Sequence, residues 1–411
     1  HLGPFVDKPP PDAPDGSIPP PRGFGGPYTS FGSPTFWLNT NVTPDAPTAA
    51  TMIENLWHKV KGKHLDGVIF VTPQALSSLM GALGPIDVPK LHYTVTADNV
   101  VQFVTNQAFF LLNKEQTARN RVLGLVASQV LHRFFAANHP QPAVKAMVEA
   151  ASKGYIIVHA VDPAVESGFV QAGIAGGFGP DHTDFFSVVS NNIAGNKVDY
   201  YVKNSIDYQV DLKPGGTASA DVAVTLDNTA PSQSGYNEAL GPYPTHRTEP
   251  HGLQLSSGED YSFLAFYCSR ACSGTATEPD GRTTLARFPQ DTMTAFAGET
   301  RLKPKTFQTF HLNLSTPGGW TGNDVGGTYR LVFQAQPTIQ AAFVRFAIAL
   351  PPGMRMVSTN IPVTFDKAGR LLWEGTIGRT QEIDIRFERP LLEKLWVRTK
   401  DFLSRPVFKI G

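Results

Sequence analysis

The sequence predicts a mixed α+β protein in which a layered α/β/α domain precedes one or more β-sandwich modules. Between about residues 45 and 204, apolar residues recur at helical spacing and alternate with short apolar runs typical of buried strands. After residue 205 the apolar period changes from about 3.6 to 2, which predicts many short strands and a sandwich of immunoglobulin-like type. We therefore expect the layered domain at residues 39–204 and the sandwich at residues 205–390.

Charge and hydropathy exclude two classes of protein. The 411 residues carry 35 basic and 35 acidic side chains, so the formal net charge is zero. Nucleic-acid-binding domains normally carry a basic surface. No apolar run approaches the roughly 18 residues that a membrane-spanning helix needs. We therefore expect no nucleic-acid partner and no transmembrane helix in this chain.

The two ends of the sequence differ from the domains between them. Residues 1–38 are rich in proline and glycine, which disfavour helix and sheet interiors and predict an extended arm. The arm also carries Phe24 and Tyr28, so it is either a flexible tail or a segment laid over a neighbouring surface. Residues 391–411 predict an amphipathic C-terminal helix or tail.

Local signals place single elements in the layered domain. An apolar run at residues 65–71 predicts a buried strand, after which Thr72 and Pro73 supply a helix cap and a first-turn proline. Apolar spacing predicts a long helix from about Gln116 to Ala136. The apolar run from Phe185 to Ser190 predicts another strand of the same domain.

The rear half contains runs in which apolar and polar residues alternate. In the first run, Ile206, Tyr208 and Val210 are separated by polar residues, as in a half-buried strand. Turn-rich segments connect the runs, which is typical of all-β modules. The predicted strands are 205–212, 220–228, 260–267, 306–314, 328–334, 343–350, 371–376 and 382–387.

The only two cysteines, Cys268 and Cys272, lie four positions apart. A disulfide between them closes a short loop, which contributes roughly 2 kcal/mol in the chain-entropy description. Half of a zinc site is the alternative, but zinc takes four ligands and the chain has no second cysteine pair. We predict the disulfide, which indicates an oxidising compartment and a secreted or surface-exposed protein.

The first residue is His1 rather than methionine. We therefore expect that an upstream segment was removed by a signal peptidase, by another protease or by the choice of sequence boundaries. An upstream fragment of the same precursor is one expected partner.

No standard catalytic motif occurs in the sequence. Asn191, Lys197 and Asp199 belong to a turn-forming segment that either stabilises a turn or forms a ligand loop at a sheet edge. Asp66 either begins a strand or faces a site. Residues 181–184 include two aspartates and a histidine, but adjacent residues rarely converge on one ion, so we interpret them as a cap and expect no metal site.

Five short segments follow one another in a recognisable order: Asp66-Gly67-Val68-Ile69, Leu83-Gly84-Pro85, Thr96-Ala97-Asp98-Asn99-Val100, Val188–Val202 and Val222–Asn228. This pattern resembles the bacterial secreted family known as domain of unknown function 4012, over about residues 35 to 270. The resemblance implies a membrane-anchored family that faces outward in bacteria that make surface polysaccharides. We accordingly expect an extracytoplasmic location, at the cell envelope or secreted.

A more distant similarity concerns Gln116-Thr117-Ala118-Arg119-Asn120-Arg121. This segment resembles the arginine pair of the LytR-CpsA-Psr phosphotransferases, which transfer lipid-pyrophosphate-linked glycopolymers onto peptidoglycan. Two guanidiniums at a helix start can bind a pyrophosphate, so Arg119 and Arg121 are phosphate-binding candidates, with a solvated helix face as the alternative. The upstream catalytic arginine and aspartate segment of those enzymes has no counterpart here, which favours a non-enzymatic role.

Three functional hypotheses follow. The leading one is an extracytoplasmic cell-envelope protein that binds or organises a surface glycopolymer, or assembles with other envelope proteins, without a cofactor. The enzymatic alternative is a phosphotransferase or pyrophosphatase acting on lipid-linked glycans, with a divalent metal ion and with unknown catalytic residues. The third is a structural subunit of a surface appendage, whose arm inserts into the next subunit.

Overall fold

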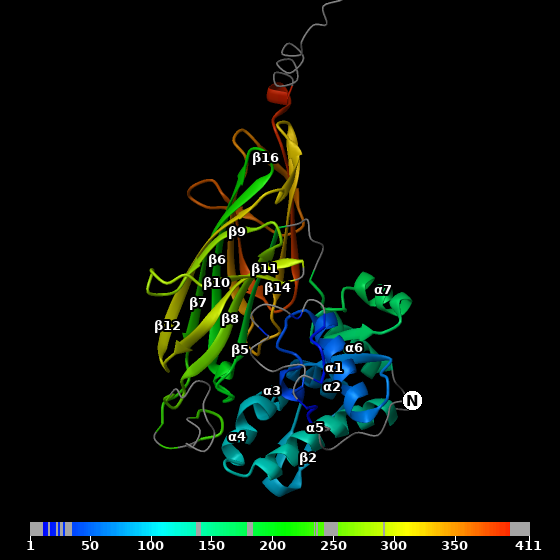
Figure 1. The fold of residues 1–411 in the computed structure, drawn as a ribbon. Helices are drawn as coiled ribbons and strands as arrows, with labels where there is room; N and C mark the ends of the chain where they lie inside the picture. The colour runs from blue at the N-terminus through cyan, green and yellow to red at the C-terminus, as the bar shows by residue number, and fades with distance from the viewer. Residues whose placement is uncertain are drawn as a thin grey trace, which may run out of the picture.

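Two large β-sheets and a group of helices make up the fold of the computed structural model (Figure 1). The helices lie beside one end of the sheets, and the strands run away from them. The structure describes residues 11–14, 17–21, 24, 28, 35–136, 141–178, 184–233, 235, 237–241, 254–290 and 292–394.

The helical unit, residues 46–171, contains the helices and two pairs of short strands. β1 pairs with β4, and β2 pairs with β3, in both cases antiparallel. Helices α2, α3 and α5 share an apolar core with β2 and β3. The elements are α1 (Ala46–Lys61), β1 (Gly67–Val71), α2 (Pro73–Leu83), β2 (Ile86–Val88), β3 (Tyr93–Val95), α3 (Val100–Gln102), α4 (Ala108–Leu111), α5 (Gln116–Ala136), α6 (Gln141–Ser152), β4 (Ile156–Ala160) and α7 (Pro163–Gln171).

The apolar run at residues 65–71 forms a strand, β1, but the prediction that this strand is buried is wrong: its residues are half-buried or exposed, because among the described strands β1 pairs with β4 alone. The signals of α2 and α5 are confirmed. Thr72 is the N-cap of α2, where its hydroxyl accepts a hydrogen bond from Ala75 N at 3.4 Å, and Pro73 is the first helical residue. Helix α5 has the predicted bounds. These elements depend on capping and apolar spacing within a few residues, so the sequence alone determines them.

The rear of the molecule consists of an eight-stranded and a seven-stranded sheet. The first has the order β10-β11-β8-β5-β14-β19-β16 with β13 beside β14, and the second has the order β17-β18-β15-β6-β7-β12-β9. The strands are β5 (Asp184–Asn192), β6 (Val202–Lys213), β7 (Thr217–Asn228), β8 (Asp260–Ser269), β9 (Ser273–Thr277), β10 (Ala286–Gln290), β11 (Met293–Leu302), β12 (Thr306–Thr316), β13 (Trp320–Asn323), β14 (Gly326–Ala335), β15 (Ala342–Ala349), β16 (Arg355–Thr359), β17 (Thr364–Phe365), β18 (Leu371–Ile377) and β19 (Gln381–Glu388).

One apolar core lies between the two large sheets. It joins side chains such as Phe266 of β8 and Phe346 of β15, which belong to opposite sheets. All eight period-2 runs of the sequence are strands, namely β6, β7, β8, β12, β14, β15, β18 and β19. The mixed α+β class with a strand-rich rear half is therefore confirmed.

The strand predicted at Phe185–Ser190 was assigned to the wrong part of the fold. As β5 it lies in the eight-stranded sheet, where it pairs antiparallel with β8 and parallel with β14. Phe185 and Phe186 pack in two different apolar cores, one on each face of the sheet. Because both faces of the strand are buried, its sequence lacks period-2 alternation and resembles that of a strand in a layered α/β sheet. Within the described part of residues 39–204, β1 and β4 form a two-stranded antiparallel sheet in place of the expected layer.

Asp184, the first residue of β5, is buried between the sheets. Its carboxylate accepts hydrogen bonds from the hydroxyls of Tyr329 at 2.7 Å, Tyr208 at 3.1 Å and Thr316 at 3.1 Å. Burial raises the pKa of Asp184, and these hydroxyl bonds partly oppose that effect. Tyr208 and Thr316 belong to the seven-stranded sheet, so the carboxylate ties the two sheets together. Residues 181–183 of the expected cap lie outside the described residues.

The described residues of the N-terminal arm lie against this chain. Ile18 is buried beside Leu56 of α1. Phe24 and Tyr28 pack on the outer face of the eight-stranded sheet, and the Tyr28 hydroxyl is hydrogen-bonded to the Tyr267 hydroxyl of β8. Of the two open interpretations of the arm, these residues fit the segment laid over a neighbouring surface.

The C-terminal end of the described chain lies far from the helical unit (Figure 1). Residues 391–394 form one helical turn there. The rest of the predicted C-terminal helix, residues 395–411, lies outside the described residues.

The predicted disulfide between Cys268 and Cys272 is confirmed, with 6.0 Å between the Cα atoms. Cys268 belongs to β8 of the eight-stranded sheet, and Cys272 directly precedes β9 of the seven-stranded sheet. The bond therefore closes the connection at which the chain crosses from one sheet to the other.

Candidate functional site

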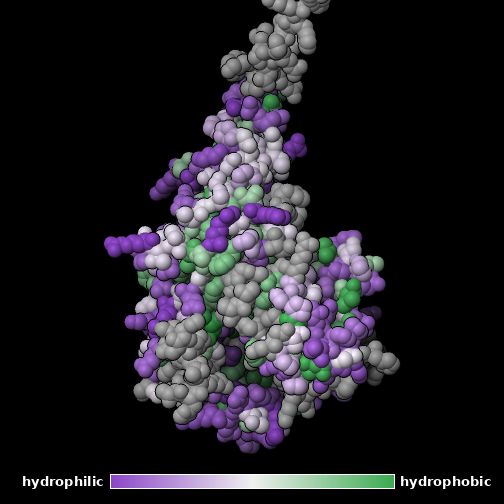
Figure 2. Space-filling view, viewed as in Figure 1, coloured by the Kyte–Doolittle hydropathy of each residue, from purple (hydrophilic) through white to green (hydrophobic). Residues whose placement is uncertain are grey.

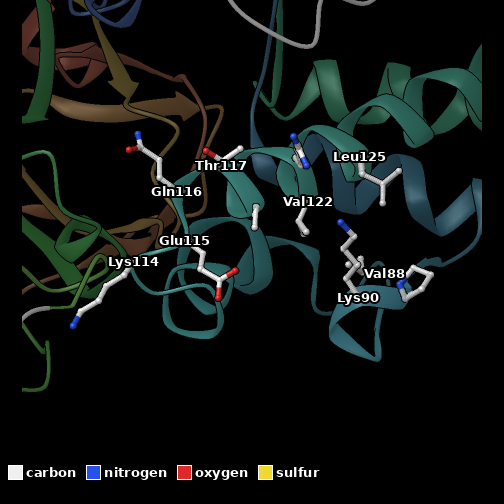
Figure 3. A pocket seen from close by; sticks show the side chains of 11 residues that line it. Val88, Lys90, Lys114, Glu115, Gln116, Thr117, Val122 and Leu125 are labelled. Atoms are coloured by element: carbon white, nitrogen blue, oxygen red, sulfur yellow. The ribbon is translucent and has the colours of Figure 1, made fainter.

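A groove lies where the first turns of α5 meet the connection between β2 and β3 (Figure 3). It has a volume of about 840 Å³, and we call it the α5 groove. Val88, Val122 and Leu125 give it an apolar floor. Gln116 and Thr117 bring the first turn of α5 to its wall, where backbone N–H groups lack intrahelical partners and favour anions.

Three exposed cationic side chains, Lys90, Lys114 and Arg121, line the α5 groove beside a single carboxylate, that of Glu115. In Figure 3 the Lys90 side chain extends toward α5, whereas that of Lys114 points away from Lys90. The positive charges are thus spread along the groove. This spacing suits an extended anionic ligand better than one compact phosphate.

Arg119 does not reach the α5 groove. Its guanidinium is buried, donates to Leu112 O at 3.1 Å, pairs with Glu238 at 3.2 Å and lies 4.8 Å from the centre of the Phe109 ring. Residues two apart on a helix do not face each other, so Arg119 and Arg121 point to different surroundings. The two expected phosphate-binding arginines are therefore not brought together.

Lys197 lies beside Arg119 instead of beside a ligand site. Its ammonium is 5.2 Å from the centre of the same Phe109 ring, and its backbone N–H donates to Ala239 O at 2.8 Å. We call Phe109, Arg119, Lys197 and Glu238 the Phe109 joint. It connects the α4–α5 corner of the helical unit to residues 197–201 and 237–241, so two of the predicted binding residues hold the fold together.

The other candidates from the sequence make separate contacts. The Asn191 side chain donates to Val42 O at 3.1 Å, and Asp199 accepts from the Asn192 side chain at 3.0 Å. The Asp199 contact lies within the turn and supports the turn-stabilising interpretation, whereas Asn191 belongs to β5 and its contact connects that strand to the segment before α1. Asp66 directly precedes β1, its side chain is exposed, and its carbonyl accepts from the Val161 N–H at 3.0 Å.

Sequence reasoning missed a group of three neighbouring titratable side chains in the helical unit. His159 Nδ1 of β4 lies 3.1 Å from Glu166 of α7, and its Nε2 lies 3.8 Å from Glu54 of α1. Burial raises the pKa of Glu54, while His159 lowers it and Glu166 raises it. The two ring nitrogens face different carboxylates, so the imidazole bridges two helices. Among the described side chains, no group of three or more His, Cys, Asp or Glu is placed to hold a metal ion.

Lys90 and Lys114 were also missed, since Lys90 comes from the β2–β3 connection and Lys114 precedes α5. Only the folded arrangement brings them to one groove. The sequence offered one signal for Lys114. It lies two residues before a predicted helix start, the end of a helix that favours anions.

Residues 13–109 match the family model described as "Protein of unknown function (DUF4012)". This match supports the resemblance of the front part of the chain to that family. No curated protein matches the chain.

Several solved structures align with part of the chain at low similarity. A protein described as a nutrient binding protein from Legionella pneumophila is 12% identical with a TM-score of 0.32, over 55% of this chain and 80% of that one. An M1 zinc metallopeptidase from Deinococcus radiodurans is 10% identical with a TM-score of 0.25, over 46% of this chain and 42% of the metallopeptidase. An aminopeptidase N family protein from Idiomarina loihiensis is 9% identical with a TM-score of 0.25, over 44% of this chain and 29% of the aminopeptidase. At these TM-scores the likenesses carry no argument about function.

Of the helices in the described ranges, none combines the length and the apolar character needed to cross a membrane.

The Phe109 joint predicts different effects for two neighbouring arginines. Arg119→Ala removes a buried cation and leaves Glu238 without it, so we expect the free energy of unfolding to fall by about 3 kcal/mol. Arg121→Ala, on the exposed face of the same helix, should change it by less than about 0.5 kcal/mol. Urea unfolding of both variants measures the difference; equal effects would contradict the inward placement of Arg119.

Asp260 predicts a pH dependence of stability. It begins β8 and is buried; burial chiefly raises its pKa to about 7, with Asp199 and Glu259 adding to the rise and Ser262 opposing it. The folded protein therefore keeps a proton that the unfolded chain releases near pH 4. The stabilising contribution is complete below about pH 4 and is lost as the pH rises through about 7, at up to about 1.4 kcal/mol per pH unit.

The variant Asp260→Asn should lack this decline, because the amide does not ionise. The exposed Asp221→Asn is the matched control, since it changes the charge by the same amount. Unfolding free energies measured from pH 4 to 8 compare the two, and parallel curves would show that Asp260 keeps an ordinary pKa.

Proposed function

We propose that the chain acts outside the cytoplasm at a bacterial cell envelope, where it binds or organises an acidic surface glycopolymer. The observation that carries the proposal is the α5 groove, which combines Lys90, Lys114 and Arg121 with an apolar floor. The disulfide between Cys268 and Cys272 supports an oxidising compartment. The family match at residues 13–109 supports the resemblance on which the envelope location rests.

The chemistry of the groove fits a charged polymer. Lysine and arginine attract phosphate or carboxylate groups, and the positive end of α5 adds to that attraction. Since the cations are spread along the groove, successive acidic groups of one polymer can each approach a different side chain. The apolar floor at Val88, Val122 and Leu125 can cover the less polar faces of the sugar units.

Binding is favoured over phosphotransfer by the position of Arg119. A pyrophosphate clamp needs forked donors that converge on one group. Arg119 is instead neutralised by Glu238, which leaves Arg121 as the single guanidinium of the α5 groove. The likeness of the helical unit to the LytR-CpsA-Psr enzymes, and that of the paired sheets to an immunoglobulin-like module, remain parts of this proposal.

The appendage hypothesis receives less support from the arm. Phe24 and Tyr28 are 2% and 0% exposed against the eight-stranded sheet of the same chain. Side chains buried in this way are not offered to a neighbouring subunit. Assembly with other envelope proteins is retained in the inference below.

Binding of poly(glycerol phosphate) to the full chain tests the proposal, with dextran as the neutral polymer. We expect Lys90→Ala combined with Arg121→Ala to weaken binding at least about tenfold, or about 1.4 kcal/mol. The exposed pair Lys203→Ala and Lys367→Ala removes the same charge elsewhere and should leave affinity within about twofold. Isothermal titration at two salt concentrations measures both, and binding should weaken as salt screens the charges.

Equal losses in the two double variants would mean that net charge alone attracts the polymer, which would contradict a site at the α5 groove. Turnover of a polyprenyl-pyrophosphate probe by the wild type that is lost in Arg121→Ala would replace the binding function by the enzymatic alternative.

A further inference from the structure

The outer edge of β1 has no partner strand in the ranges that the structure describes. β1 pairs with β4 alone, and these two strands form the whole of their sheet. Natural proteins usually cover an open edge, or protect it with charge, proline or a bulge. The run Gly67-Val68-Ile69-Phe70-Val71 contains neither charge nor proline. This edge therefore remains able to pair with another strand.

Two hydrogen bonds that flank the ladder show which residues of β1 face β4. Val161 N donates to Asp66 O, and Thr72 N donates to Tyr155 O, both at 3.0 Å. Bonded residues alternate along an antiparallel pair. The even-numbered residues from 66 to 72 are therefore the ones that bond to β4.

The odd-numbered residues consequently face outward. Val158, which lies opposite Ile69, donates its N–H to Ile174 on the other side of β4, as this pattern requires. The N–H and C=O groups of Gly67, Ile69 and Val71 point away from β4, toward the open edge. Together they offer three donors and three acceptors over about 14 Å.

The side chains beside this edge are apolar and accessible. Ile69 is 61% exposed and Val71 is 44% exposed. Both line a cavity of about 500 Å³, which is also lined by Val189 and Asn191 of β5 and by Gln336. A strand added beside β1 would lie about 4.8 Å away and could place alternate side chains in this cavity.

We propose that the open edge of β1 binds an extended segment of a separate polypeptide, which adds a third strand to the β1–β4 sheet. The partner is defined by its chemistry: an unbranched extended backbone with apolar side chains at every second position. A sugar or a phosphate cannot match donors and acceptors that alternate at the spacing of a strand. This surface is independent of the α5 groove, so the inference goes beyond the proposed polymer binding.

Selection from a displayed library of random ten-residue peptides on the full chain tests the inference. We expect selected peptides with apolar residues at alternate positions. The best one should lose at least tenfold in affinity when the amides of one strand edge, every second residue, are N-methylated. Methylation of the other edge should change affinity less than threefold. A peptide that tolerates both patterns, or a selection without enrichment, would overturn strand addition.

Protein variants place the peptide on β1. Ile69→Pro removes the outward N–H and leaves the bonds to β4 in place, so we expect a tenfold loss of peptide affinity; proline is tolerated at such edge positions. Ile69→Ala keeps the N–H and should retain most of the affinity. Val357→Pro, at an exposed position of β16, is the control and should bind as the wild type does.

Sedimentation decides between a separate chain and a second copy. Self-association of the wild type that disappears in Ile69→Pro would assign the edge to a second copy and overturn the inference as stated. If Ile69→Pro does not fold, the N-methylated peptides on the wild type still decide the question.

Discussion

Burial of strands β5 and β8 on both faces is the constraint on which the rest of the structure depends. One face of these strands packs in the core between the two large sheets, and the other packs against the arm and Met52 of α1. A shift of one residue would exchange the two faces, so the register is fixed from both sides. The arm, α1 and the second sheet are thereby positioned by the same two strands.

The same arrangement explains why neighbouring arginines have different roles. The Phe109 joint holds the α4–α5 corner through Arg119, and the next arginine along the helix, Arg121, faces the α5 groove. Because the joint fixes one face of α5, it also holds Arg121, on another face of the helix, in place relative to Lys90. The proposed polymer site therefore depends on an ion pair that never touches the ligand.

Sequence patterns predicted local elements well and long-range placement less well. The cap at Thr72, the bounds of α5 and the eight alternating strands depend on neighbouring residues, which the sequence displays directly. The sheet to which β5 belongs depends on partners far along the chain, such as β8 and β14, and two-sided burial removed its alternation. Lys90 escaped notice for the same reason, since only folding brings it to α5. Arg119 and Arg121 were paired by proximity in sequence, although helical geometry separates them.

Hydrogen exchange of the full chain, with and without poly(glycerol phosphate), tests most directly whether the α5 groove is where the protein meets an acidic polymer. The account predicts slower exchange confined to the β2–β3 connection around Lys90 and to the segment from Lys114 through the first turns of α5. Slower exchange on the large sheets, with the first turns of α5 unchanged, would contradict it.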